Sequence, residues 1–167
     1  MSPFTRILVP TDFSPAADLA LAHAKALAQA FGASLHLLHV FDDPYTAAAY
    51  APEVFATLPP EYREAAFADA VRQLNQRIGA QEIREFGGTT DVVVGSPARE
   101  IVRVAAERGV DLIVMGTHGR SGLAHLVLGS VAERVVRTAP CAVLTVRNTS
   151  TASEPASADT TRAGTAS

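Results

Sequence analysis

The sequence predicts an α/β protein: a Rossmann-like, open, five-stranded parallel sheet with helices on both faces. Three observations support this class. Short apolar runs rich in β-branched residues alternate along the chain with segments of helical periodicity. The apolar runs are continuous, which is typical of parallel strands buried on both faces. The 167 residues are 48% hydrophobic and 19% charged, which suits one globular domain with a sizeable core.

The first strand is expected at 7–9, where an apolar run includes β-branched residues. Ser14 and Pro15 then predict the start of a helix, because serine is a favoured N-cap and proline fits the first helical position. This alanine-rich helix is expected to run to about Phe31. Gly32 stops it, as glycine commonly does at a helix end.

After a second strand at 34–41, the connection 42–60 carries four prolines and is long for a compact domain. It is either a functional flap or a local excursion. A second helix follows, because apolar residues recur at spacings of four, three and four. These residues are Phe67, Val71, Leu74 and Ile78.

The second half of the chain repeats the alternation. Gly95-Ser96-Pro97 repeats the helix start seen at Ser14, and Ser130 with Glu133 has the spacing of a capping box. The expected elements are a strand at 91–94, a helix from 97 to near 109, a strand at 111–115, a glycine-rich stretch at 116–129, a helix at 130–138 and a fifth strand at 141–146.

The composition changes after the fifth strand. Residues 147–167 contain no Ile, Leu, Val, Phe or Tyr and are rich in Ser, Thr and Ala. Such a segment buries too little apolar surface to offset its ordering entropy. The expected organisation is one domain at 1–147 and a disordered Ser/Thr/Ala-rich tail at 148–167.

The simplest right-handed winding of these units places the strands in the order 3-2-1-4-5. The order 2-1-3-4-5 is also compatible with the pattern. In the first order the winding reverses between strands one and four, and open α/β sheets bind ligands at the carboxyl ends of the strands at such a point. The residues expected there are Pro10, Thr11 and Asp12 after strand one, and 116–119 after strand four.

The 116–129 stretch has features of an anion site. Its glycines allow close approach of backbone N–H groups, and it ends at the start of a helix, where free N–H groups and the helix dipole favour phosphate. We expect a phosphate among Gly119, Gly129, Ser130 and Val131, with Arg120 adding charge at the rim. His118, between two of the glycines, is either a solvated loop residue or a phosphate neighbour.

The spacing of these residues resembles a known family. Gly116, two residues, Gly119, nine residues and then Gly129-Ser130 match the G-2x-G-9x-G-(S/T) nucleotide motif of universal stress proteins. The runs 7–14, 95–97, 119–122 and 129–132 are also similar to that family. The resemblance covers residues 4 to about 147.

The resemblance implies a bound ATP, or AMP or ADP, at the switch point. By position, Asp12 would lie beside the ribose and phosphates and help to hold Mg²⁺ or Mn²⁺. Val40 would meet the adenine edge through its backbone, and Met115 would line the site. Gly116 and Gly119 would approach ribose and phosphate, while Gly129, Ser130 and Val131 would bind phosphates. Without a ligand, Asp12 would instead cap the turn at Ser14.

The fifth strand, Cys141–Val146, forms an edge of the predicted sheet and carries neither a charge nor an internal proline. Unprotected edges favour pairing with another chain. The resemblance points the same way, to a homodimer through this strand. Covering of the edge by the tail is the alternative.

Several partner classes are not expected. The net charge of −3 gives no field suited to nucleic acid or an anionic membrane, and the single cysteine cannot form an internal disulfide. Without a signal peptide or an apolar stretch of about 20 residues, the chain is expected to be cytoplasmic.

Three functions remain open at this point. The first is a stress-response module in which adenine-nucleotide occupancy modulates dimer or partner interactions. The second is a slow ATPase, since phosphate binding without an evident general base gives weak hydrolysis at best. The third is a nucleotide-free dimeric interaction protein.

Overall fold

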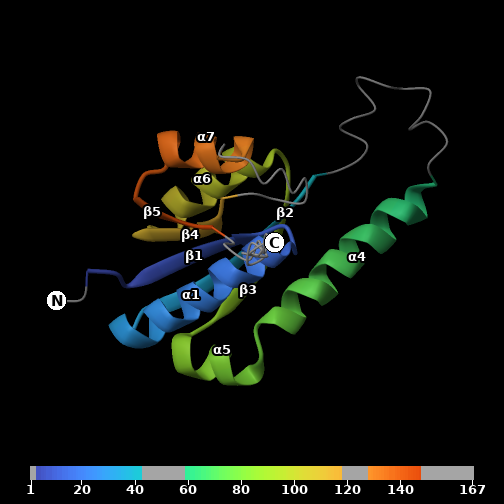
Figure 1. Cartoon of the computed structure of the whole chain (residues 1–167). Coiled ribbons are helices and arrows are strands. Elements are labelled where there is room, and N and C mark those ends of the chain that lie inside the picture. Colours follow the sequence, from blue (N-terminus) through green and yellow to red (C-terminus); the bar gives the residue numbers. More distant parts are fainter. Residues whose placement is uncertain (1–2, 43–58, 118–127, 148–167) are drawn as a thin grey trace, which may run out of the picture.

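A computed structural model of the chain describes residues 3–42, 59–117 and 128–147 (Figure 1). Its strands form one five-stranded parallel sheet in the order β3-β2-β1-β4-β5, which confirms the predicted fold class and strand order. The 148–167 tail and most of the 42–60 connection lie outside the described residues. The elements are β1 (Arg6–Thr11), α1 (Pro15–Phe31), β2 (Ser34–Phe41), α4 (Pro60–Arg77), α5 (Ala80–Phe86), β3 (Thr89–Val94), α6 (Pro97–Glu107), β4 (Leu112–Gly116), α7 (Ser130–Thr138) and β5 (Ala142–Val146).

Helices cover both faces of the sheet (Figure 1). On one face, side chains of α1 and the C-terminal end of α4 pack against alternate residues of the central strands, such as Ile7 and Val9. On the other face, α6 and α7 pack against the intervening residues of the same central strands, such as Leu8 and Ile113. The central strands are therefore buried on both sides, as their continuous apolar runs predict.

Several boundaries differ from the sequence prediction. β1 extends through Thr11, so Pro10 and Thr11 are its last residues rather than residues beyond it. Of the four apolar residues predicted for the second helix, Leu74 and Ile78 are buried and Phe67 and Val71 are half-buried, and Ile78 lies just after the last residue of α4. α5 was not predicted, because seven residues are too few to show helical periodicity. Among the described helices, none combines the length and apolar character needed to cross a membrane.

His36 is a buried titratable group at the start of β2. Its Nδ1 lies 2.6 Å from the Thr89 hydroxyl, and its Nε2 has no hydrogen-bond partner among the described residues. Nε2 lies 3.5 Å from the carboxylate of Asp91, which pairs with Arg108. Burial, helped by the positive charge of Arg108 and opposed by Asp91, lowers the pKa of His36 to about 4. His36 is therefore neutral in the folded protein at neutral pH.

The two Ser-Pro helix starts should differ in their contribution to stability. The Ser14 hydroxyl accepts a hydrogen bond from the Ala17 amide at 3.2 Å, whereas Ser96 makes no side-chain cap bond. We expect Ser14→Ala to lower the free energy of unfolding by about 1 kcal/mol. Ser96→Ala should change it by less than about 0.5 kcal/mol. Denaturant unfolding of the two variants measures the difference, and equal losses would contradict this assignment.

The His36 site predicts a pH dependence of stability. Unfolded His36 has a pKa near 6.5, so between pH 6.5 and 4 the unfolded state binds a proton that the folded state does not. Stability from this group is thus complete above pH 6.5 and falls by about 1 kcal/mol per pH unit as the pH drops toward 4. Denaturant unfolding at several pH values in this range measures the free energy of unfolding, which should depend less steeply on pH in His36→Gln than in the parent protein. The same pH dependence in both proteins would refute the prediction.

Candidate functional site

The sheet opens between β1 and β4 at its carboxyl end. β1 pairs with β2 along six positions, from Arg6 to Thr11, but with β4 only at Ile7 and Leu8. The Arg6 carbonyl accepts from Asp111 N, so the backbone groups of Arg6, and of every second residue after it, point toward β4. Pro10 is one of these residues and has no N–H to donate. The ladder to β4 therefore ends before Pro10, and the two strands separate.

A cavity of about 300 Å³ occupies this opening. Nine of the twelve residues predicted for the site line it, and His118, Gly119 and Arg120 lie outside the described residues. The nine come from β1, β2, β4, the turn after β1 and the start of α7. They are Pro10, Thr11, Asp12, Val40, Met115, Gly116, Gly129, Ser130 and Val131.

One half of the cavity is apolar. Leu38 and Val40 point to the same face of β2, and Pro97 and Ile101 contribute the first turns of α6. Met115 closes this side from β4. Sequence reasoning missed Leu38, Pro97 and Ile101, together with Ala17, Thr117 and Ala132. The i, i+2 spacing from Val40 could have identified Leu38, and the i, i+4 spacing from Pro97 could have placed Ile101 on the same helix face as Pro97.

The other half of the cavity is the N-terminus of α7. The structure makes Gly129 the N-cap and Ser130 the first helical residue, with no side-chain cap bond. The capping box expected from Ser130 and Glu133 is therefore wrong, because Ser130 is the first helical residue rather than the N-cap and makes no cap bond with its side chain. The Gly129 amide donates to the Thr117 carbonyl at 2.8 Å, which holds the two ends of the glycine-rich segment together. The first N–H groups of a helix have no intrahelical acceptor, so this end of the cavity suits an anion.

Gly116 lets β4 approach α1 closely. A Cβ atom at this position would lie 3.1 Å from backbone and Cβ atoms of Ala16, closer than ordinary van der Waals contact. The first turn of α1 is thus held against the end of β4, and Ala17 joins the lining of the cavity.

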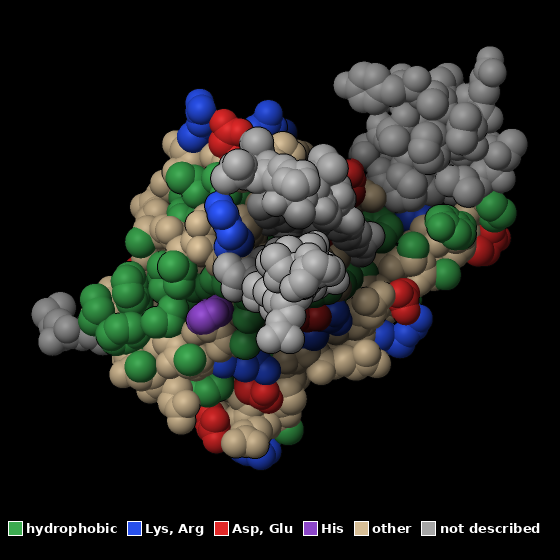
Figure 2. Space-filling view, in the orientation of Figure 1, with side chains coloured by type: hydrophobic (Ala, Val, Ile, Leu, Met, Phe, Trp, Pro, Cys, Tyr) green, Lys and Arg blue, Asp and Glu red, His purple; other side chains and the backbone are tan. Residues whose placement is uncertain are grey.

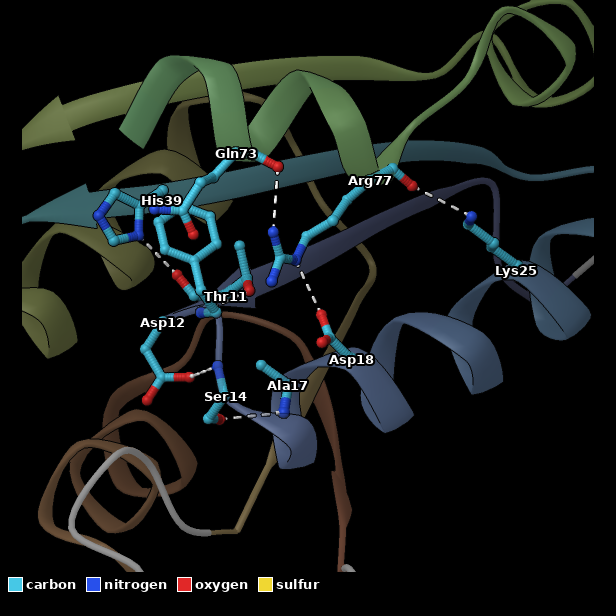
Figure 3. Close-up of polar contacts among 10 residues, drawn as sticks. Thr11, Asp12, Ser14, Ala17, Asp18, Lys25, His39, Gln73 and Arg77 are labelled. Carbon is cyan, nitrogen blue, oxygen red and sulfur yellow. Dashed lines mark hydrogen bonds and ion pairs between the residues drawn. The ribbon is translucent and has the colours of Figure 1, made fainter. Parts of the chain in front are cut away.

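Asp12 lies in a tight turn at the edge of the cavity. One of its carboxylate oxygens accepts a hydrogen bond from the Ser14 amide at 3.1 Å, and the Thr11 hydroxyl accepts one from the Phe13 amide at 3.0 Å (Figure 3). Asp12 was expected either to contact the ligand or to cap the turn at Ser14. The structure is compatible with both, because Asp12 accepts a hydrogen bond from the Ser14 amide at the start of α1 and also lines the cavity.

Comparison with known proteins gives consistent results. A family model described as the universal stress protein family matches residues 3–147. Universal stress protein MJ0531 from Methanocaldococcus jannaschii is 35% identical over 149 residues, which cover 86% of this chain and 82% of that protein. Universal stress protein MJ0577 from the same organism is 32% identical over 157 residues, which cover 86% of this chain and 95% of the relative.

The solved structures show the same likeness. The structure of MJ0577 aligns with a TM-score of 0.72 at 33% identity, covering 89% of this chain and 99% of that one. A universal stress protein crystallised in complex with cAMP aligns with a TM-score of 0.58 at 28% identity, covering 86% of this chain and 96% of its own. With the family model spanning the whole described sheet, the chain belongs to the universal stress protein family.

Proposed function

We propose that this protein binds an adenine nucleotide, ATP or the related AMP or ADP, as part of a stress response, and that occupancy modulates its interactions with a second copy or with protein partners. One observation carries the proposal. A single cavity of about 300 Å³ joins an apolar wall to the uncapped N-terminus of a helix. A nucleotide has the matching halves, a flat base and an anionic phosphate chain.

The two halves of the cavity predict the orientation of the bound nucleotide. The base packs against Leu38, Val40 and Ile101, with the Val40 backbone at the adenine edge. The phosphates lie at the start of α7, where Ser130 and Val131 supply backbone N–H groups, while Gly129, whose own amide donates to the Thr117 carbonyl, lets the ligand approach closely. We expect Gly119, from its place in the family motif, to approach the phosphates and Arg120 to add positive charge at the rim. The similar universal stress protein in complex with cAMP supports an adenine ligand.

Asp12 is the candidate ligand for a divalent cation. Its carboxylate lines the cavity and is the hard oxygen donor that Mg²⁺ and Mn²⁺ prefer. Within 3–42, 59–117 and 128–147, no group of three His, Cys, Asp or Glu side chains is placed to hold a metal ion. We therefore expect such a cation to be held jointly by Asp12 and the nucleotide phosphates, and to supply charge neutralisation there.

A thermal-unfolding experiment tests nucleotide binding. If ATP binds with a dissociation constant of about 10 µM, 1 mM Mg-ATP adds about 2.7 kcal/mol of stability. For a chain of this length the melting temperature should rise by about 5 to 11 °C. Gly119→Val, which replaces the second glycine of the family motif, should abolish the shift. Ala124→Val, in the same segment but outside the motif glycines, should retain it.

The absence of a shift with ATP, ADP, AMP and cAMP, in protein freed of carried-over nucleotide, would refute the proposal. An assay of phosphate release on the same samples separates binding from hydrolysis. Turnover at ordinary enzymatic rates that Asp12→Ala abolishes would identify the protein as an ATPase instead.

We further propose that β5 forms a homodimer by antiparallel pairing with the same strand of a second copy. β5 is an edge of the sheet, and Leu144 on it and Val136 on α7 are exposed. Figure 2 shows hydrophobic side chains gathered on the side of the molecule where β5 lies. A symmetric dimer buries this apolar surface and satisfies the free edge of the strand.

Light scattering at micromolar concentration tests the dimer. The protein should have the mass of two chains, and Leu144→Glu should shift it toward the monomer, since it places like charges at the shared strand. Ile83→Glu, an equivalent change at an exposed position on α5, should leave the mass unchanged. A monomeric parent protein would disprove the pairing.

A further inference from the structure

Phe13 adopts an unusual backbone conformation beside the nucleotide cavity. Its φ is 66°, and it is the one non-glycine residue with positive φ among the described residues. Bulky L-residues are strained in this region, so such a conformation persists only where surrounding contacts hold it. The contacts of Phe13 therefore control the turn that carries Asp12.

The first of these contacts is with His39 on β2. The two rings are stacked with their centroids 4.3 Å apart and their planes 25° apart. Nδ1 of His39 lies 2.8 Å from the Thr11 carbonyl, and the Phe13 amide donates to the Thr11 hydroxyl. The stack and the end of β1 are thus one connected unit, part of which Figure 3 shows.

The second contact comes from Arg77, the last residue of α4. Its guanidinium carbon lies 4.7 Å from the centre of the Phe13 ring, and its Nε donates to Asp18 in the first turn of α1 at 2.8 Å. The Arg77 side chain is only 21% exposed, so the cation is largely withdrawn from water. A desolvated cation over an aromatic ring is a favourable contact.

The backbone of Arg77 is also anchored. Its carbonyl accepts a hydrogen bond from Nζ of Lys25 on α1 at 3.2 Å, and the same Nζ pairs with Glu82 on α5 at 2.7 Å. Nη1 of Arg77 in turn donates to the Gln73 carbonyl one turn earlier in α4. Figure 3 shows that the bonds of Arg77 to Lys25 and Asp18 run from α4 to α1, while its bond to Gln73 stays within α4. The end of α4 is therefore fixed to α1 while its arginine contacts the Phe13 ring.

Asp12 connects this cluster to the cavity. The hydrogen bond from the Ser14 amide to the Asp12 carboxylate spans Phe13, so its geometry depends on the backbone angles of Phe13. Asp12 lines the nucleotide cavity and also an adjoining cavity of about 530 Å³, to which α4 contributes Asp69 and Gln73. A shift of α4 would reach Asp12 through the Phe13 ring.

We propose that Arg77 is a positioning residue of the nucleotide site. Through the Phe13 ring it holds Asp12 in its binding orientation, and it thereby couples the docking of α4 to nucleotide affinity. This inference rests on the proposed function. Because coupling between sites is reciprocal, a bound nucleotide also strengthens the attachment of α4 to the turn.

Calorimetric titration with Mg-ATP tests this role in matched variants of one helix. Arg77→Gln removes the cation over Phe13, and we expect it to weaken binding about 3- to 30-fold. Arg72→Gln removes an exposed arginine of α4 that pairs with Asp69 in its own helix, and it should leave affinity within about twofold. Asp18→Asn, which retains Arg77 but weakens its anchor, should lower affinity in the same direction and provides a second variant if Arg77→Gln does not fold.

A double-mutant cycle tests whether Arg77 acts through Phe13. Phe13→Asn removes the ring but retains a residue that tolerates positive φ. In that background Arg77→Gln should have no further effect on ATP affinity, because the group through which it acts is absent. Additive losses, or equal losses in Arg77→Gln and Arg72→Gln, would overturn the proposal.

Hydrogen exchange in the absence of nucleotide keeps this inference separate from the proposed function. Arg77→Gln should accelerate exchange of the Ser14 amide, which is bonded to Asp12, while Arg72→Gln should not. If the parent protein binds no adenine nucleotide, the proposed function fails and exchange alone decides the role of Arg77. Faster exchange then supports positioning, and unchanged exchange refutes it.

Discussion

The separation of β1 from β4 is the constraint on which the candidate site depends. Parallel strands ordinarily continue their ladder, but Pro10 has no N–H at the position that would next bond to β4. The sheet therefore divides at its carboxyl end just where the winding reverses. The turn after β1, the end of β4 and the start of α7 then line a common cavity, while β1 stays paired with β2 along its whole length.

Close packing around this opening brings together the two parts of the cavity, the apolar wall and the N-terminus of α7. Gly116 brings the first turn of α1 to the end of β4, and the bond between Gly129 and Thr117 sets the start of α7 opposite. The apolar wall belongs to the same side-chain layer that packs α6 on the sheet. The cavity is thus a continuation of the core that ends at the N-terminus of α7, so an apolar wall and a helix end suited to an anion lie next to each other.

Much of the fold was predictable because its signals are local. Strand two and the helix from Pro15 to Phe31 match the structure, since a continuous apolar run and a Ser-Pro start with a glycine stop are complete within one segment. The capping box predicted at Ser130 does not form, because Ser130 and Gly129 are both acceptable N-caps and the fold selects Gly129, which has no side chain to cap the helix. The short helix α5 carries too few residues for a period to appear.

By itself the sequence determined the order of the elements, the burial of the central strands on both faces and the glycine spacing that resembles the universal stress protein family. These follow from periodicity and residue chemistry along the chain. Tertiary structure decided that Leu38 and Ile101 share a wall, that His36 is held neutral and that Phe13 takes a left-handed conformation between His39 and Arg77. The physical reason is that each depends on contacts between segments far apart in the chain, which exist only after strand pairing and helix docking.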